Sequence, residues 1–356
     1  MFAHALFTAI APELRTDSIS LLGTGLVAGW ETVADKPEHR TDSTSMLYAA
    51  RQLEHVFDDV YEEDFPDLPG ANGSLMPEDR SVNEGAKTWT YYMYSGTAIA
   101  RWAADYSGGT LPRVSRQGAE VTRRCHPIEN EYAYTTEDMR AAAFAGDQLD
   151  SALGTLARRG HDVQKHRSAL WGRSELGVDG LLTLPNSTVL SATASFVSAT
   201  VDQIVADVGA LIESCDTLTN GLRKATRVLM SRRVMNLLIR RRLGTGDGTL
   251  SIMDYLRKTW ADVEFMILEE LDHRKAAEEA AADPAFPVDV DSSTGDVMVA
   301  YIHNQPKVLR LVEPMTFKQH PMQFVSLEFV VPCESKIGGI RCPEPLTITR
   351  LEGVHA

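Results

Sequence analysis

Glycine-rich and acidic stretches are the first places in this sequence where chemistry is conceivable. GTGDGT at residues 244–249 has the small residues that let backbone N–H groups surround a phosphate. It lacks the lysine and hydroxyl pair that hold phosphate and magnesium in such loops, and helical patterns flank it on both sides. We therefore interpret it as a flexible connection between two helices.

A second stretch, DVDSSTGDVMVA from residue 289, begins like a calcium-binding loop. Asp289, Asp291 and Ser293 occupy the first three ligand positions of such a loop. The turn glycine is displaced to Gly295, however, and Ala300 stands where a calcium loop has a bidentate glutamate. Two strands joined by a Ser-Thr-Gly turn explain this stretch better.

The histidines and cysteines show no metal-binding or catalytic spacing. His161 and His166 are five residues apart, so a helix does not place them on one face as i, i+4 ligands. A hairpin could bring two of the four cysteines together as a disulfide, but free buried thiols account better for the set: Cys125, Cys215, Cys333 and Cys342. We expect no catalytic residue, metal or cofactor, and an enzyme with an unrecognised site remains the most distant alternative.

Composition narrows the class of protein further. The 356 residues are 44% hydrophobic and 24% charged, which is ordinary for a globular chain. The formal net charge of −14 argues against a dedicated nucleic-acid-binding protein, which would carry a basic surface. No window approaches ~18 uninterrupted apolar residues, so we predict no membrane span.

An aromatic segment at residues 83–114, NEGAKTWTYYMYSGTAIARWAADYSGGTLPRV, combines core-type side chains with glycines that interrupt packing. Loose alternation of aromatics and threonines predicts a long hairpin or extended ribbon. A ribbon of this kind exposes aromatics that its own fold does not cover, and exposed apolar surface normally marks an interaction site.

A long amphipathic helix is predicted over residues 135–166. Thr135 and Asp138 form a capping-box variant at its start. Apolar or small residues then recur at steps of three and four, and we expect these to pack: Gly146, Leu149, Leu153, Leu156 and Gly160. Each glycine costs about 1 kcal/mol in a helix interior, so close approach of a sheet is the expected compensation.

The remaining elements give an α+β order with no regular βαβ alternation. Helices are predicted at residues 199–218, 231–243 and 251–260, and strands at 225–231 and 262–271. MQFVSLEFVVP and PLTITRLEGV near the end of the sequence are strands again.

Charge is unevenly distributed along the chain. Residues 223–242 hold eight bases and no acid, whereas DDVYEEDFPD at residues 58–67 holds six acids and no base. The basic segment is explained as the exposed face of one strand-helix unit, or as a contact with the acidic run of a neighbouring subunit. The second interpretation would pair Asp58, Asp59, Glu62, Glu63 and Asp64 with Arg232, Arg233, Arg240, Arg241 and Arg242.

The order of these motifs resembles the major capsid proteins of tailed bacteriophages with the Hong Kong 97-like fold, in the branch related to encapsulin shells. The resemblance covers about residues 46–354. It rests on the acidic helix, the glycine-punctuated loop closing at LPRV, YAYTTEDMRAAAFAGDQLD, ALWGRSELGVDGLL and MQFVSLEFVVPCESKIGGIRCPEP.

The resemblance implies a division of the chain. Residues 1–80 would be an N-terminal arm with an acidic helix, and 81–118 an extended loop lying over an adjacent subunit. Residues 119–166 would belong to a peripheral domain with a spine helix at 135–166, and 167–318 to an axial domain. Residues 319–356 would return to the peripheral sheet. Interface residues implied in the extended loop are Trp89, Tyr91, Tyr92, Tyr94, Arg101, Trp102 and Arg113.

The implied function is that of a major capsid protein, whose hexamers and pentamers form an icosahedral shell around a double-stranded DNA genome. Its implied partners are other copies of itself, a portal protein, separate scaffolding and decoration proteins, and packaged DNA through weak nonspecific contact. It would be assembled in the cytoplasm of a bacterial host and reside in the virion. An encapsulin-like compartment shell is the alternative with the same fold.

Overall fold

The computed structural model describes residues 65–102, 112–145, 149–244, 250–274 and 295–354. The chain divides into two units at Phe65 and Pro66, and every element below lies in the second unit. The expected acidic helix, the acidic residues 58–64, Gly146 and most of the GTGDGT loop fall outside the described residues.

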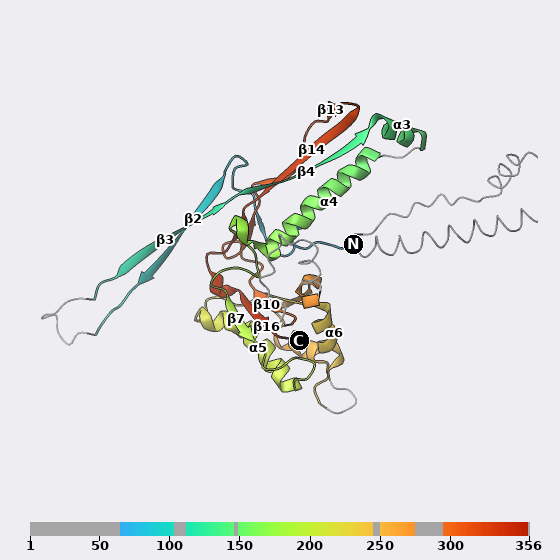
Figure 1. Ribbon diagram of the computed structural model, residues 1–356. Helices are drawn as coiled ribbons and strands as arrows, with labels where there is room; N and C mark the ends of the chain where they lie inside the picture. The colour runs from blue at the N-terminus through green and yellow to red at the C-terminus, as the bar shows by residue number, and fades with distance from the viewer. Residues whose placement is uncertain (1–64, 103–111, 146–148, 245–249, 275–294, 355–356) are drawn as a thin grey trace, which may run out of the picture. The chain divides into compact units, whose positions relative to one another are not determined.

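The aromatic segment forms the predicted ribbon (Figure 1). Strand β2 (Thr88–Thr97) pairs antiparallel with β3 (Ser115–Arg124) in an unbroken register from Thr88 opposite Arg124 to Thr97 opposite Ser115. The returning strand thus continues past the expected boundary at residue 118. After the single residue Cys125, the chain enters β4 (His126–Thr135).

A four-stranded sheet continues from the ribbon. Its long central strand is β14 (Glu328–Ile337), which pairs with β4 over ten residues on one side. On the other side it pairs with β12 (Met315–Gln319) and β13 (Gln323–Val325).

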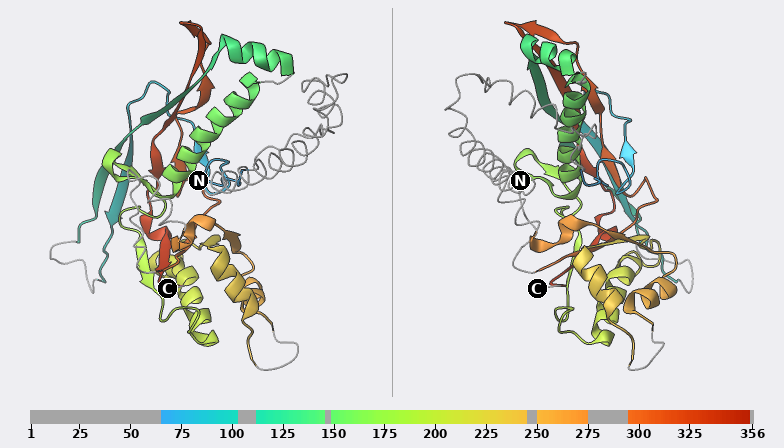
Figure 2. Two further views of the ribbon diagram at one scale, coloured as in Figure 1. Left: turned by 45° about the vertical axis from the view of Figure 1, so that its right-hand side comes forward. Right: turned by 90° about the vertical axis from the view of Figure 1, so that its right-hand side faces the viewer.

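The expected spine helix is two helices, α3 (Thr136–Ala145) and α4 (Leu149–Leu170), and the second runs four residues beyond the expected end. Figure 2 shows α4 lying along this sheet.

The face of α4 that packs on the sheet differs from the expected one. Gly154 and Ala157 are buried, and Ala157 clusters with Val331 and Cys333 of β14. Leu156 is 50% exposed, Gly160 is exposed and Leu153 is only half-buried. Our prediction that Leu156 packs on the sheet is therefore wrong. Gly160 does approach the sheet, since an added Cβ there would lie 3.3 Å from Asn130 Nδ2 of β4. Gly146 and the side chain of Leu149 lie outside the described residues.

The physical reason is polar residues on the buried face of α4. Between Ala157 and the apolar Ala169 and Leu170, the buried positions of α4 are His161, Lys165 and His166, which a hydrophobic periodicity cannot recognise. The expected close approach of a sheet occurs at Gly160 and also at Gly154, where an added Cβ would lie 2.9 Å from Gln319 Nε2.

A second, five-stranded sheet has the order β7-β16-β10-β8-β9. Its strands are β7 (Thr188–Ser191), β16 (Thr349–Glu352), β10 (Met298–Tyr301), β8 (Arg227–Met230) and β9 (Glu264–Ile267). Both faces of the central strands are buried. Val228 and Met230 face one core and Leu229 faces the other, as expected for a strand covered on both sides.

Three helices cover the first face of this sheet: α5 (Val201–Leu218), α6 (Arg232–Arg240) and α7 (Ile252–Thr259). All three were predicted, and serine or threonine caps their N-termini. The opposite core contains Leu75, Met76, Trp171 and Leu271 of the 3-10 turn η2 (Glu269–Leu271), and Tyr301 Oη donates to Leu75 O at 2.6 Å. A further 3-10 turn, η4 (Pro345–Thr347), precedes β16.

Small elements join the two sheets. β1 (Glu78–Asp79), β11 (Arg310–Val312) and β15 (Gly339–Arg341) form a three-stranded sheet, and β5 (Gly172–Arg173) pairs with β6 (Val178–Asp179) after a short 3-10 turn, η1 (Ser174–Leu176). The expected division fails at three strands. β12 belongs to the sheet under α4, and β15 pairs with β11. β16 lies between β7 and β10, because its Leu351 packs into the core under α5.

Candidate functional site

The ribbon has one face that packs on its own subunit. Trp89 is 7% exposed, and its Nε1 donates a hydrogen bond to Gly338 O at 2.9 Å. Tyr91 stacks on Trp89 with ring centroids 5.7 Å apart, and its hydroxyl donates to Cys342 O at 3.4 Å. Our expectation that Trp89 and Tyr91 form the subunit interface is therefore wrong, because strand alternation turns both inward.

The opposite face of the ribbon is open. Tyr92 and Tyr94 are 63% and 62% exposed, and the Arg116 guanidinium lies 4.0 Å from the centre of the Tyr94 ring. Beyond β2, the Trp102 side chain is fully exposed, as are Arg101 and Arg113. The structure thus separates the expected set into two inward anchors and five outward residues.

A cavity of about 110 Å³ lies beneath the ribbon, between Trp89 and Met93 on one side and Leu184 and Pro345 on the other. Pockets that bind small molecules usually have about 300–1,000 Å³. This cavity is therefore too small to be a substrate site, and it marks where the ribbon rests on the body.

A second exposed apolar surface, here called the hairpin tip, was missed by sequence reasoning. It comprises Met322, Phe324, Val325 and Leu327, all of them more than half exposed. Internal contacts tie it together, since Tyr134 Oη lies 3.3 Å from Met322 Sδ.

The turn of the hairpin tip is conformationally unusual. Ser326 and Leu327 link β13 to β14 with φ values of 48° and 75°, a region that side chains normally avoid. A branched apolar residue held there and exposed costs energy that the isolated subunit does not recover. The sequence could have indicated this unusual turn, because Ser326 and Leu327 stand where tight hairpin turns usually have Gly, Asn or Asp.

Three of the five arginines expected to make charge contacts have partners within their own chain. Arg232 pairs with Glu269, and Arg241 donates to the carbonyls of Val197 and Ala199. The prediction of inter-subunit contacts is therefore wrong for Arg232, Arg233 and Arg241. Arg240 and Arg242 are exposed, and their expected acidic counterparts lie outside the described residues.

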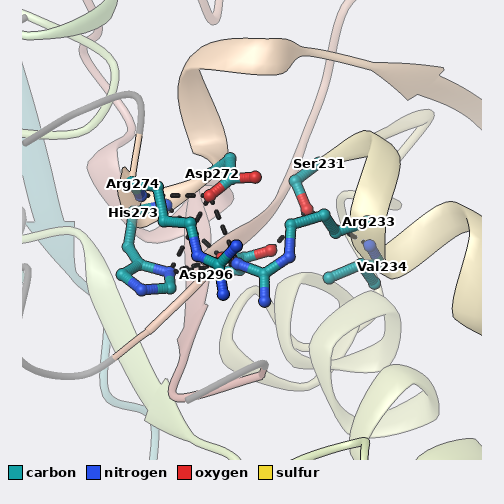
Figure 3. A network of polar contacts seen from close by, with 7 residues as sticks. All are labelled: Ser231, Arg233, Val234, Asp272, His273, Arg274 and Asp296. Carbon is teal, nitrogen blue, oxygen red and sulfur yellow. Dashed lines mark hydrogen bonds and ion pairs between the residues drawn. The ribbon is translucent and has the colours of Figure 1, made fainter. Parts of the chain in front are cut away.

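Arg233 belongs to a buried polar network (Figure 3). Its Nη1 lies 3.3 Å from Asp272 Oδ1 and 3.4 Å from Asp296 Oδ1, and His273 Nδ1 lies 2.8 Å from the same Asp296 oxygen. Ser231 Oγ donates to the other Asp296 oxygen at 2.6 Å. Asp272, His273 and Asp296 have the donor types of a metal site. The Arg233 guanidinium already lies between the two carboxylates and offsets one of their two negative charges, so we interpret the network as a structural tie.

A second polar group has the residue types of a catalytic triad. His161 Nδ1 lies 2.6 Å from Ser335 Oγ, and His161 Nε2 lies 2.9 Å from Asn130 Oδ1. Ser335 and His161 are only 6% and 3% exposed, and burial lowers the pKa of His161. A substrate cannot reach this hydroxyl in the folded chain, so the group joins α4 to the sheet.

Within the described residues, no helix is long and apolar enough to cross a membrane. The surface features that stand out are instead the outer ribbon face and the hairpin tip, which are apolar and uncovered. Surfaces of this kind are typical of chains that bury them against other chains.

Solved structures with the same arrangement come from phage capsids. The capsid of Myoviridae phage XM1 matches with a TM-score of 0.70 and 16% identity, over 86% of this chain and 98% of that one. The capsid of a native GTA particle matches with a TM-score of 0.59 and 12% identity, over 89% and 100%. Mycobacterium phage Ogopogo matches with a TM-score of 0.56 and 11% identity, over 85% and 98%. The fold is therefore the Hong Kong 97-like fold of capsid subunits.

The family model described as major capsid protein matches residues 99–354, and the chain belongs to this family. A search of curated protein sequences returns no match. The chain is thus a structural subunit that self-assembles into the shell of a virion. The family and the capsid matches favour a phage capsid over an encapsulin-like compartment.

Proposed function

We propose that this major capsid protein forms hexamers and pentamers of an icosahedral shell enclosing double-stranded DNA, and that the outer ribbon face binds the adjacent subunit. The supporting observation is the division of the ribbon. Trp89 and Tyr91 hold it on its own subunit, while Tyr92, Tyr94 and Trp102 point away and are uncovered.

The parts of the chain have separate roles in this proposal. Residues 1–80 act as the N-terminal arm and 81–124 as the extended loop. The sheet under α4 forms the peripheral domain, and the five-stranded sheet with α5, α6 and α7 forms the axial domain. The hairpin tip supplies a second contact between subunits, because its strained, exposed Leu327 needs another chain to cover it.

We also propose the partners that such a shell requires. A portal protein occupies one vertex, and separate scaffolding and decoration proteins act during and after assembly in the bacterial cytoplasm. The net charge of −14 limits contact with packaged DNA to weak, nonspecific interactions. The buried Ser335–His161–Asn130 group supports a subunit without catalytic activity.

The test compares Trp102→Ala with Leu222→Ala. Both residues are exposed, at 102% and 73%, but only Trp102 lies next to the ribbon. Loss of an aromatic anchor at an interface costs about 2 kcal/mol or more, so the subunit concentration needed for shells should rise at least about thirtyfold for Trp102→Ala. Electron microscopy and sedimentation velocity measure this threshold.

Folding of the dissociated subunit provides the second readout. Exposed substitutions change the free energy of unfolding by about 0.5 kcal/mol or less, so both variants should unfold at the wild-type denaturant concentration. Equal assembly of the Trp102 and Leu222 variants would contradict the proposed ribbon interface.

A further inference from the structure

A polar cavity of about 390 Å³ opens between α6 and α7, away from the ribbon and the hairpin tip. Its volume is within the range of pockets that bind small molecules. It is lined by Ile239, Arg242, Ser251, Met253, Asp254 and Arg257.

A short backbone ladder fixes the two walls of the cavity. Arg242 and Ser251 form an antiparallel bridge, Leu243 N–H donates to Leu250 O at 3.0 Å, and Ile252 N–H donates to Arg241 O at 3.0 Å. The ladder places Arg242 opposite the first turn of α7. Arg257 projects from the same helix, three residues after Asp254.

The two arginines differ from other arginines on this part of the chain. Arg223 forms two hydrogen bonds of 2.9 Å with Glu344, and Arg227 pairs with Glu264 at 2.6 Å. Neither Arg242 nor Arg257 has a side-chain hydrogen bond or ion pair with any residue that the structure describes, and both are exposed.

Asp254, the acidic residue that lines the cavity, already accepts a hydrogen bond from its own chain. Ser251 Oγ donates to Asp254 Oδ2 at 2.6 Å, and the Asp254 backbone N–H donates to Ser251 Oγ at 3.1 Å. Ser251 thereby caps α7, and the Asp254 carboxylate lies in the first turn, where the helix dipole favours a negative charge. Two arginines and one aspartate leave the cavity with one net positive charge on a chain whose net charge is −14.

We propose that this cavity binds a small molecule carrying a phosphate group, held by the Arg242 and Arg257 guanidinium groups. Guanidinium donors match phosphate oxygens in fork geometry, and two of them lining one cavity can give a charge-assisted site. Ile239 and Met253 supply an apolar wall for the rest of the ligand. A single carboxylate from a neighbouring subunit would fill only a small part of the volume. The site does not depend on the proposed ribbon interface.

Equilibrium dialysis of the full chain with radiolabelled inorganic phosphate and with thymidine monophosphate tests the site, in dissociated subunits and in shells. Removal of one charge-assisted contact should weaken binding by about tenfold or more, so Arg242→Ala and Arg257→Ala should each raise the Kd by that factor. Lys258→Ala is the matched control, because Lys258 is the next exposed base on α7 but does not line the cavity.

The outcomes separate the alternatives. Binding of both probes by wild type and the Lys258 variant, with loss in both arginine variants, supports the site. A single-stranded oligonucleotide added as competitor shows whether DNA phosphates are an alternative source of the ligand group. No binding by wild type, or equal weakening by Lys258→Ala, overturns the proposal. An assembly defect of the arginine variants that added phosphate does not change would also overturn the proposal, because it would indicate that the arginines contact a neighbouring chain.

Discussion

Gly172 and Gly177 have nearly the same backbone conformation in very different surroundings. Their φ values are +67° and +68°, in the left-handed region that favours glycine. An added Cβ at Gly172 would lie 2.2 Å from Val178 O and 2.5 Å from Gly180 N, whereas one at Gly177 would meet nothing within 4 Å. Alanine substitutions at the two positions therefore distinguish the cost of backbone strain from the cost of steric crowding.

We expect Gly177→Ala to lower the free energy of unfolding by about 1 kcal/mol, from backbone strain alone. Gly172→Ala should cost about 3 kcal/mol or more, because crowding of fixed backbone atoms adds to the same strain. Urea unfolding of dissociated subunits measures both. Equal losses would show that the turn between β5 and β6 moves aside.

Trp89 shows how far the sequence could identify interface residues. The prediction of a ribbon is confirmed, but the ribbon's own sequence does not say which of its two faces is covered. Trp89 is inward because Gly338, 249 residues later, leaves space for its indole ring: an added Cβ there would lie 2.7 Å from Nε1. A contact between such distant residues cannot be derived from local spacing.

We expect Trp89→Ala to destabilise the isolated subunit, unlike Trp102→Ala. Loss of a buried tryptophan costs about 3–5 kcal/mol. The free energy of unfolding of dissociated subunits should fall by that amount. An unchanged unfolding transition, with impaired assembly only, would place Trp89 at the interface after all.

At the scale of elements, a buried charge network joins β1, α4 and the segment after β11. Lys165 Nζ lies 2.6 Å from Glu78 Oε1 and 3.0 Å from Glu313 Oε1, and Arg80 bridges the same carboxylates at 2.7 and 3.3 Å. Burial raises the pKa of Glu313, and the nearby Lys165 only partly offsets it. Burial also acts to raise the pKa of Glu78, but Lys165 and Arg80 leave that pKa below its usual value.

The signs of these shifts predict a pH dependence. Glu78, with a lowered pKa, stabilises the fold above its unfolded-state pKa, and this contribution is lost as pH falls through its folded-state pKa. Glu313, with a raised pKa, costs stability as pH rises from the ordinary value through the raised one. Lys165→Met should therefore cost about 3–5 kcal/mol at pH 7, where both buried carboxylates are charged without their main partner.

Acidification should reduce this loss. As pH falls from 7 toward the ordinary carboxyl pKa, protonation of Glu313 relieves the repulsion in the variant, so its difference from wild type should narrow. Denaturant unfolding at a series of pH values measures the difference, with the exposed Lys258→Met as control. A difference that stays constant with pH would assign the loss to packing of the lysine chain.

The spine helix shows what periodicity captures and what it does not. Its capped start is confirmed, since the Asp138 N–H donates to Thr135 Oγ1 at 3.1 Å and Thr135 N–H donates to Asp138 Oδ2 at 3.0 Å. Its packing face was misassigned because His161 and Lys165 are buried through partners on β14, β4, β1 and the segment after β11. Burial of polar residues depends on partners that the helix sequence does not contain.

At the scale of the whole molecule, all four cysteines are free and buried. Burial raises the pKa of Cys215 to about 11 and that of Cys342 to about 12, and it also raises the pKa values of Cys125 and Cys333. Because the thiolate is the nucleophile, two units of pKa reduce the reactive fraction of Cys215 by about 100-fold.

We therefore expect native protein to react with a thiol reagent such as dithionitrobenzoate at least about 100-fold more slowly than unfolded protein. Denaturation should release four reactive thiols, since the sequence holds four cysteines and none is paired. A native thiol that reacts within seconds would contradict the described burial, and fewer than four thiols after denaturation would indicate a disulfide.

The sequence was sufficient to predict the order of the elements and the family. It was not sufficient to predict which strands belong to which sheet. The predicted strands of the chain's last part exist as β13, β14 and β16. β16 nevertheless joins the sheet of β7 and β10. Its Leu351 packs into the core under α5, and the hydroxyls of its Thr349 and of Ser214 in α5 share a hydrogen bond of 2.7 Å. Pairing between strands that are so far apart in the sequence depends on the packing of the whole core.

The continuity of β3 and β4 has a mechanical consequence. Only Cys125 separates them, so residues 115–135 form an almost uninterrupted extended chain of ~70 Å from the ribbon into the sheet (Figure 1). Tension applied at the ribbon runs along covalent bonds and loads the ten-residue pairing of β4 with β14 in shear, so that its hydrogen bonds bear force together. A pull from a neighbouring subunit would thus be carried directly to the strands under α4, without first separating the ribbon's own strands.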